Sequence, residues 1–182
     1  EFFCLFSDDD ILEPECVRLF YQTLETDPET ADVYHFDLKF IDDRGEVIGQ
    51  PGAYPPELPV NRFFSWLYTG RIDARMPEFI FRKERFRSSG GFMAFDLAWR
   101  SDNATVIRCG LRTGIRTIPG AWVRWRFSGA NISHDRSETA EKRKDDATVS
   151  FFNWVDATLR ETGMDYELGE TALLKGYCAN LL

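Results

Sequence analysis

The chain has 182 residues, of which 43% are hydrophobic and 15% are aromatic, and this composition excludes a disordered protein and suffices for one folded domain. Its formal net charge of −8 argues against a nucleic-acid-binding protein, which would carry a basic face. The four cysteines are scattered without a C-x-x-C pair and only two histidines are present, which argues against a tetrahedral zinc site and favours buried thiols in a reducing compartment.

The first quarter of the chain predicts a strand, a helix, a second strand and a hairpin. Residues 2–6 are an apolar run that predicts a buried strand, and three aspartates, Asp8–Asp10, follow it. Apolar residues at helical spacing after a proline predict a helix over 14–26. Alternation over 33–41 predicts a strand with one covered face, and 46–49 is expected to return as a hairpin arm.

The rest of the chain continues to interleave helices and strands. We expect, in chain order, an irregular proline-rich loop over 51–59, a helix over 61–68, a strand over 79–82, a short helix from Lys83, a flexible loop over 88–92, a helix over 103–111, strands around a turn at Pro119–Gly120 within 115–126, a polar loop over 128–135, an amphipathic helix that includes Phe151 and Leu159, and a last helix over 170–181. This order predicts an α/β or α+β domain.

The aspartate cluster is the first candidate site. Ligands bind open α/β sheets beyond the carboxyl ends of the strands, and adjacent carboxylates repel one another unless a cation or solvent screens them. A hard divalent cation is typically held by one or two carboxylates, with water and substrate phosphates as its other ligands. The alternative is a solvated acidic cluster that the dipole of the following helix stabilises.

Residues 3–14, Phe-Cys-Leu-Phe-Ser-Asp-Asp-Asp-Ile-Leu-Glu-Pro, resemble the Asp-x-Asp segment of the family-2 glycosyltransferases. In that family a strand delivers aspartates to a metal ion and to the diphosphate of a nucleotide. The resemblance implies Asp10 as a ligand of Mg²⁺ or Mn²⁺ and Asp8 as a second metal ligand on the nucleotide side. Ser7 stands where the family commonly has its first aspartate, which puts the role of Asp8 in doubt.

A second match begins at Gly90-Gly91-Phe92 and continues to Ser101-Asp102. The family has a Gly-Gly-Phe loop before an acidic pair at a helix start, and one carboxylate of that pair is the catalytic base. The match therefore implies that Asp102 accepts the proton of an acceptor hydroxyl. Asp96 is the competing candidate, and the structural alternative for Asp102 is a helix N-cap.

The third match lies over residues 123–133, where the family often has an aromatic-Arg pair before Ser or Asn residues. It implies that Arg126 contacts the diphosphate, because the forked donors of arginine suit phosphate oxygens. Arg124 and Arg126 could equally be partners in surface ion pairs.

The resemblance implies an α/β chain with part of a GT-A fold, a mixed sheet flanked by helices. Residues 1–135 would be the metal-binding and acceptor-side part, and 136–182 a C-terminal helical extension. The nucleotide-binding strands would precede residue 1, so the chain is expected to be truncated at its N-terminus and inactive alone.

The implied enzyme is an inverting, metal-dependent glycosyltransferase of polysaccharide biosynthesis. It would transfer a sugar from a UDP-sugar to a glycan or lipid-linked acceptor, in the cytoplasm and in peripheral contact with the inner face of a membrane. Two other functions stay open: a nucleotidyl or phosphoryl transferase of related fold, since paired metal-binding aspartates serve that chemistry too, and a non-catalytic carbohydrate-binding or assembly module.

Overall fold

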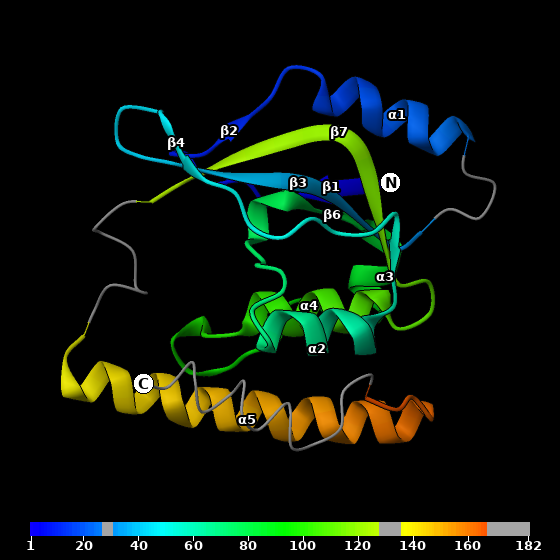
Figure 1. The fold of residues 1–182 in the computed structure, drawn as a ribbon. Coiled ribbons are helices and arrows are strands. Elements are labelled where there is room, and N and C mark those ends of the chain that lie inside the picture. Colours follow the sequence, from blue (N-terminus) through cyan, green and yellow to red (C-terminus); the bar gives the residue numbers. More distant parts are fainter. Residues whose placement is uncertain (27–30, 128–135, 167–182) are drawn as a thin grey trace.

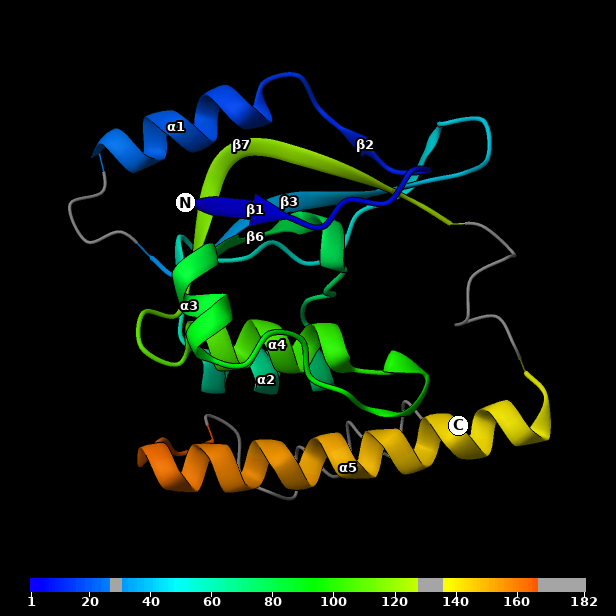
Figure 2. The ribbon, with the colours of Figure 1, turned by 180° about the vertical axis from the view of Figure 1, so that it is seen from behind.

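One mixed sheet lies at the centre of the chain and has helices on both faces (Figures 1 and 2). The computed structural model describes residues 1–26, 31–127 and 136–166, and within them seven strands join in this sheet. The strands are β1 (Phe2–Cys4), β2 (Ile11–Leu12), β3 (Val33–Ile41), β4 (Val47–Gly49), β5 (Glu57–Leu58), β6 (Phe79–Arg82) and β7 (Ile115–Arg126). Their main order is β1-β6-β3-β7-β2, with β4 beside β3 and β5 beside β7.

The helices form two layers around this sheet. They are α1 (Cys16–Thr26), α2 (Val60–Tyr68), α3 (Lys83–Ser88), α4 (Ser101–Gly110) and α5 (Glu138–Thr162), with 3-10 turns η1 (Met76–Glu78) and η2 (Asp96–Ala98). Helix α1 covers one face through Cys16 and Phe20, and α2 and α4 cover the other, with α5 packed beneath them (Figure 1). The α/β class and the mixed sheet flanked by helices are therefore as predicted.

Strand β3 is buried on both faces, so the predicted single covered face is wrong. Tyr34 and Phe36 pack toward α1, while Val33 belongs to the core formed with α2 and α4, and His35 is also buried. A central strand with helices on both faces has no face left for solvent. The predicted hairpin arm is confirmed as β4, which pairs with β3 in antiparallel fashion.

Strand β7 runs through Pro119–Gly120 without the turn that the sequence predicted there. It pairs in parallel with β3 in two stretches, Ile115–Thr117 and Trp122–Arg126, with a shift of register between them. The residues between the two stretches bulge out of the pairing, and Gly120 adopts a positive φ of 77°. Proline has no N–H to donate, and it is tolerated at an irregularity of this kind.

The opening strand is shorter and less buried than its sequence predicts. It ends at Cys4, and Leu5 and Phe6 are 49% and 37% exposed. Strand β1 lies at the edge of the sheet and pairs only with β6 among the described residues, so it has one neighbour rather than two.

The predicted helices over 14–26, 61–68, from Lys83 and around Phe151 are confirmed as α1, α2, α3 and α5. Helix α4 begins at Ser101, two residues earlier than predicted, with Arg100 as its N-cap. Asp102 therefore lies in the first turn of α4, and the alternative that it is the N-cap is wrong. The predicted loop over 128–135 and helix over 170–181 lie outside the described residues.

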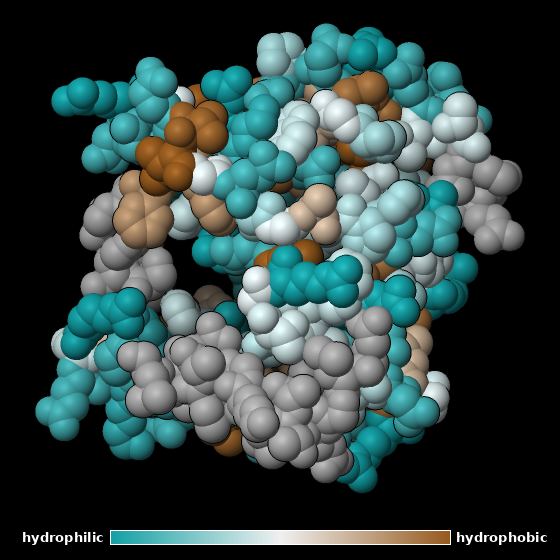
Figure 3. Space-filling view, in the orientation of Figure 1, coloured by the Kyte–Doolittle hydropathy of each residue, from teal (hydrophilic) through white to brown (hydrophobic). Residues whose placement is uncertain are grey.

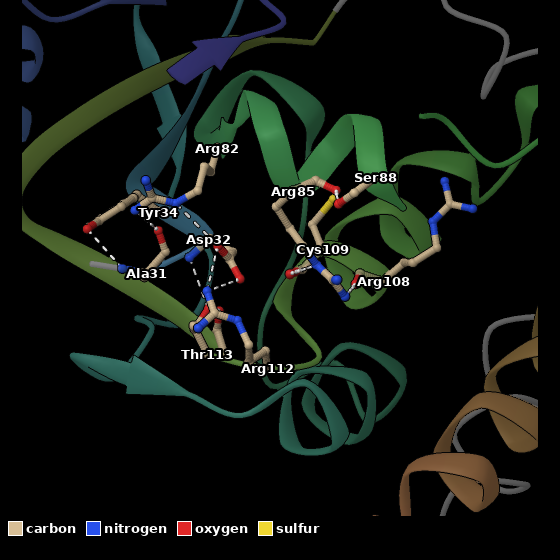
Figure 4. Close-up of polar contacts among 11 residues, drawn as sticks. Ala31, Asp32, Tyr34, Arg82, Arg85, Ser88, Arg108, Cys109, Arg112 and Thr113 are labelled. Carbon is tan, nitrogen blue, oxygen red and sulfur yellow. Dashed lines mark hydrogen bonds and ion pairs between the residues drawn. The ribbon is translucent and has the colours of Figure 1, made fainter. Parts of the chain in front are cut away.

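The start of β3 is held by a buried carboxylate, Asp32, which is 1% exposed (Figure 4). Arg82 on β6 and Arg112 after α4 form ion pairs with it, at 3.3 and 3.0 Å, and the Asp32 N–H donates to the Thr113 hydroxyl at 3.0 Å. Nearby, Arg85 donates to the carbonyls of Arg108 and Cys109. These contacts tie β3, β6, α3 and the end of α4 together.

None of the helices within the described ranges combines the length and apolar character that a membrane crossing requires.

Replacing Phe151 by alanine should lower the free energy of unfolding by about 3–5 kcal/mol, because a buried ring leaves a cavity. Phe151 is fully buried on α5, and its ring lies 6.0 Å from that of Phe64 and 6.1 Å from that of Phe95. Val149 on the same helix is 49% exposed, so Val149→Ala is the control and should change stability by about 0.5 kcal/mol or less. Urea denaturation measures both, and similar small effects would contradict the packing of α5.

Candidate active site at the end of the sheet

Asp10 is held at the end of the sheet where β7 finishes. Strand β2 pairs with β7, Ile11 opposite Arg124, and this pairing brings Asp10 beside Arg126. The backbone N–H of Arg126 donates to Oδ1 of Asp10 at 2.8 Å. The structure thus brings together two residues that lie far apart in the sequence and that the family resemblance placed in one site.

The second carboxylate oxygen of Asp10 is available for a ligand. Oδ2 is buried and has no hydrogen-bond partner among the described residues. Burial raises the pKa of Asp10, and the charge of Asp9 adds to the shift, while the Arg126 N–H and the Ser7 hydroxyl oppose it. A buried carboxylate oxygen without a partner is costly, and a hard cation is one group that would relieve this cost.

The other two aspartates of the cluster are more accessible than Asp10. Asp8 is exposed, and Asp9 is half-buried and uses its backbone carbonyl to accept from Arg126. Within the described ranges, no group of three or more His, Cys, Asp or Glu side chains is arranged to hold a metal ion. The one observation here that is compatible with a cation is the buried Oδ2 of Asp10, with the exposed Asp8 two residues before it.

The Arg126 side chain joins three segments at this end of the sheet. Its Nε donates to the carbonyl of Asp9 at 2.9 Å, and its Nη1 donates to the carbonyl of Asp42 at 2.5 Å. These bonds fix the aspartate turn against the turn that follows β3. The alternative of a surface ion pair does not describe the Arg126 side chain, which donates to two backbone carbonyls, but it does describe Arg124, which pairs with Glu13 at 3.0 Å.

Asp102, the predicted base, stands half-buried in the first turn of α4. Its Oδ1 accepts from the backbone N–H of Asn103 at 2.8 Å. Burial raises the pKa of Asp102, and the positive charges of Arg100 and Arg75 act against that rise. A raised pKa strengthens a carboxylate as a base, and the two arginines help to keep it ionised.

Arg75 contacts strand β7 and also acts on the charge of Asp102. Its guanidinium is 4.8 Å from the ring of Trp125 and forms an ion pair with Asp73. Trp125 is the neighbour of Arg126 on β7, so one arginine contacts the strand that holds Asp10 and also acts on the charge of Asp102.

The segments that carry the two candidate carboxylates lie toward the same side of the molecule. In both ribbon views the Asp8–Asp10 turn, the end of β7 and the start of α4 are on one side (Figures 1 and 2). Figure 3 shows the surface hollowed there, between the end of the sheet and the first turns of α5.

Asp96, the competing base, has a different environment. It is exposed, and Arg143 of α5 binds its two oxygens at 2.8 and 2.6 Å. The Arg143 hydrogen bonds lower the pKa of Asp96, which makes it a weaker base. The structure therefore favours Asp102 over Asp96.

The backbone before Asp102 is strained. Leu97, Ala98 and Arg100 have φ values of 55°, 53° and 66°, in the left-handed region that non-glycine residues rarely adopt. Each such residue costs about 1–3 kcal/mol, and such strain clusters at functional sites. The sequence gives no signal for it, because glycine or asparagine is expected at such positions.

A buried histidine-glutamate pair near this site was not anticipated from the sequence. His35 Nε2 is 3.8 Å from Oε1 of Glu78, and the Tyr54 ring stacks on His35 at 3.7 Å. Burial lowers the pKa of His35 to about 3 and raises that of Glu78 well above its usual range. His35 is therefore neutral at pH 7, and the contact is not an ion pair. In the sequence, Glu78 follows a proline just before a strand, and this local pattern does not predict that its side chain is buried.

A scan of the chain against models of protein families gives no match, and a search of curated proteins finds no similar sequence.

Acid should destabilise the protein through His35. Between pH 6.5 and pH 3 the unfolded chain binds a proton at this histidine and the folded protein does not, so stability falls as pH falls through this window. Relative to His35→Gln, the wild-type protein should lose about 1.4 kcal/mol per pH unit below 6.5. Urea denaturation at several pH values gives this difference, and a difference that stays constant with pH would show that His35 protonates freely in the folded state.

Proposed function

We propose that the chain is the metal-binding and acceptor-side part of an inverting, metal-dependent glycosyltransferase with a GT-A fold. It would transfer a sugar from a nucleoside-diphosphate donor, a UDP-sugar, to a glycan or lipid-linked acceptor. The observation that carries this proposal is the pair of partly buried carboxylates, Asp10 and Asp102, on segments that lie toward one side of the molecule in both ribbon views (Figures 1 and 2).

The mixed sheet supports the finer assignment of the fold. In the GT-A fold that we propose, strands deliver acidic residues to the edge where the donor binds. Here the parallel pair β3 and β7 ends at the edge where Asp10 and Arg126 meet. Residues 1–135 would form the catalytic part and 136–182 the helical extension, whose helix α5 packs on the same core as α2 and α4.

Asp102 would act as the base of a single displacement. It would take the proton from an acceptor hydroxyl while that oxygen forms a bond to the anomeric carbon of the donor sugar. The bond from that carbon to the nucleoside diphosphate breaks in the same step, and the diphosphate leaves with the electron pair. Attack opposite the leaving group inverts the configuration. The charges of Arg75 and Arg100 support this role, because they favour the ionised carboxylate before the reaction.

Asp10 and Asp8 would hold Mg²⁺ or Mn²⁺, and the partnerless Oδ2 of Asp10 supports this assignment. When bound, the ion would neutralise charge on the departing diphosphate. Arg126 would help to hold that diphosphate. Its hydrogen bonds to Asp9 and Asp42 support a role close to the donor, because they fix the turn that carries the aspartates.

Asp10→Asn should weaken Mn²⁺ binding by about tenfold or more, since even the outer partners of metal ligands contribute that much. Titration calorimetry with Mn²⁺ and UDP measures the affinity. Asp43→Asn, which removes one exposed carboxylate from the turn after β3, is the control and should leave the affinity unchanged. Equal affinity of the Asp10 variant and the wild type would eliminate Asp10 as a ligand.

Asp102→Asn should lower kcat for sugar transfer by about 100- to 10,000-fold, because the variant cannot accept the proton. The assay uses the chain with any sequence that adjoins it in its natural protein, a UDP-sugar and Mn²⁺. Mn²⁺ affinity should stay at the wild-type value, and Asp43→Asn again serves as the control. Undiminished transfer by the Asp102 variant would remove the base from this proposal.

A further inference from the structure

The N-terminal half of α5 contacts the segment that leads to Asp102. Arg143 binds both carboxylate oxygens of Asp96 in a two-pronged ion pair. One helical turn further, the Thr148 hydroxyl accepts a hydrogen bond from Nε1 of Trp99 at 3.1 Å. Lys144, which is only 5% exposed, lies between them on the helix with its Nζ 5.2 Å from the Trp99 ring.

The segment between these contacts and α4 has little regular structure of its own. Its backbone is left-handed at Leu97, Ala98 and Arg100, and Arg100 is also the N-cap of α4. The Phe95 N–H donates to the Ser101 hydroxyl at 3.3 Å, which closes the segment into a loop. A strained backbone persists only where surrounding contacts hold it. On the α5 side, polar contacts that do so come from Arg143 and Thr148, and Lys144 and Phe151 pack against the rings of Trp99 and Phe95.

We propose that α5 is a positioning element: Arg143 and Thr148 hold residues 96–100 in their left-handed conformation and thereby set the place of Asp102 in the first turn of α4. This inference rests on the proposed role of Asp102 as the base. It assigns a purpose to part of the chain, residues 138–162, to which the family resemblance does not extend.

The exposure of the Arg143–Asp96 pair favours a local role over a general one. Each side chain is 48% exposed, and ion pairs of this kind contribute little to overall stability because water screens them. The pair instead helps to select one conformation of a loop whose other contacts are a 3-10 turn, the Phe95–Ser101 hydrogen bond and the packing of its side chains. Loss of Arg143 should therefore loosen residues 95–102 while the protein stays folded.

The experiment compares Arg143→Ala and Thr148→Val with Lys142→Ala. Lys142 neighbours Arg143 on α5, but its side chain is 76% exposed and pairs with Asp146 of the same helix. Hydrogen exchange of residues 95–102, the melting temperature, and the kcat, KM and pH profile of sugar transfer are measured for each variant.

The first two variants should exchange the 95–102 amides about tenfold faster or more, since a loop held by fewer contacts opens more often. Their kcat should fall by about tenfold with KM unchanged, and the acidic limb of the pH profile should move, because the environment of Asp102 changes. The melting temperature of Arg143→Ala should stay close to the wild-type value. Lys142→Ala should match the wild type in every measurement.

Exchange that is unchanged in Arg143→Ala and Thr148→Val would overturn the proposal, whatever the activity. Faster exchange with unchanged kcat would overturn the positioning of Asp102. The double variant Asp96→Arg with Arg143→Asp restores the pair with reversed charges, and it should recover slow exchange and part of kcat. Full transfer by Asp102→Asn would instead refute the proposed function, and the exchange data would still decide whether α5 holds the segment.

Discussion

The parallel pairing of β3 with β7 is the constraint on which the rest of the structure depends. It buries β3 between two layers of helices, and it brings the carboxyl ends of both strands to one edge of the sheet. Asp42 follows β3 at that edge, and Arg126 ends β7 there. The aspartate turn comes back to the same edge through β2, so Arg126 can bond to Asp9, Asp10 and Asp42 together.

The fold removes several carboxylates partly from water. Burial raises the pKa values of Asp10, Asp102 and Glu78, so each of these groups resists ionisation in the folded protein. A protein does not gain stability from such groups, and it keeps the fold because large aromatic side chains pack on both faces of the sheet. Titratable groups with pKa values shifted by burial occur often at functional sites, although structural carboxylates can show the same shift.

The sequence predicted the parts of this arrangement that depend on local patterns. Periodicity located α1, β3, α2 and β6 closely, because their apolar residues repeat at the spacing of the element. Local patterns failed where distant contacts decide the structure. Pairing with β3 carries β7 through Pro119–Gly120, and a left-handed Arg100 starts α4 before the acid that was expected to cap it. His35 is buried beside Glu78 because three segments that lie apart in the sequence come together. The periodicity of any one segment cannot predict such a contact.

The sequence alone cannot decide between Asp96 and Asp102, whereas the fold gives the two side chains different surroundings. In the sequence both are aspartates near one helix start, and composition cannot rank them. In the fold their pKa values shift in opposite directions, because Arg143 lowers the pKa of Asp96 and burial raises that of Asp102. When the pKa values of two acids in one region are shifted apart, the acid with the raised pKa suits proton transfer. The acid with the lowered pKa suits a permanent charge. Under the function that we propose, Asp96 would anchor α5 and Asp102 would exchange a proton, and this division of roles would follow from where α5 lies.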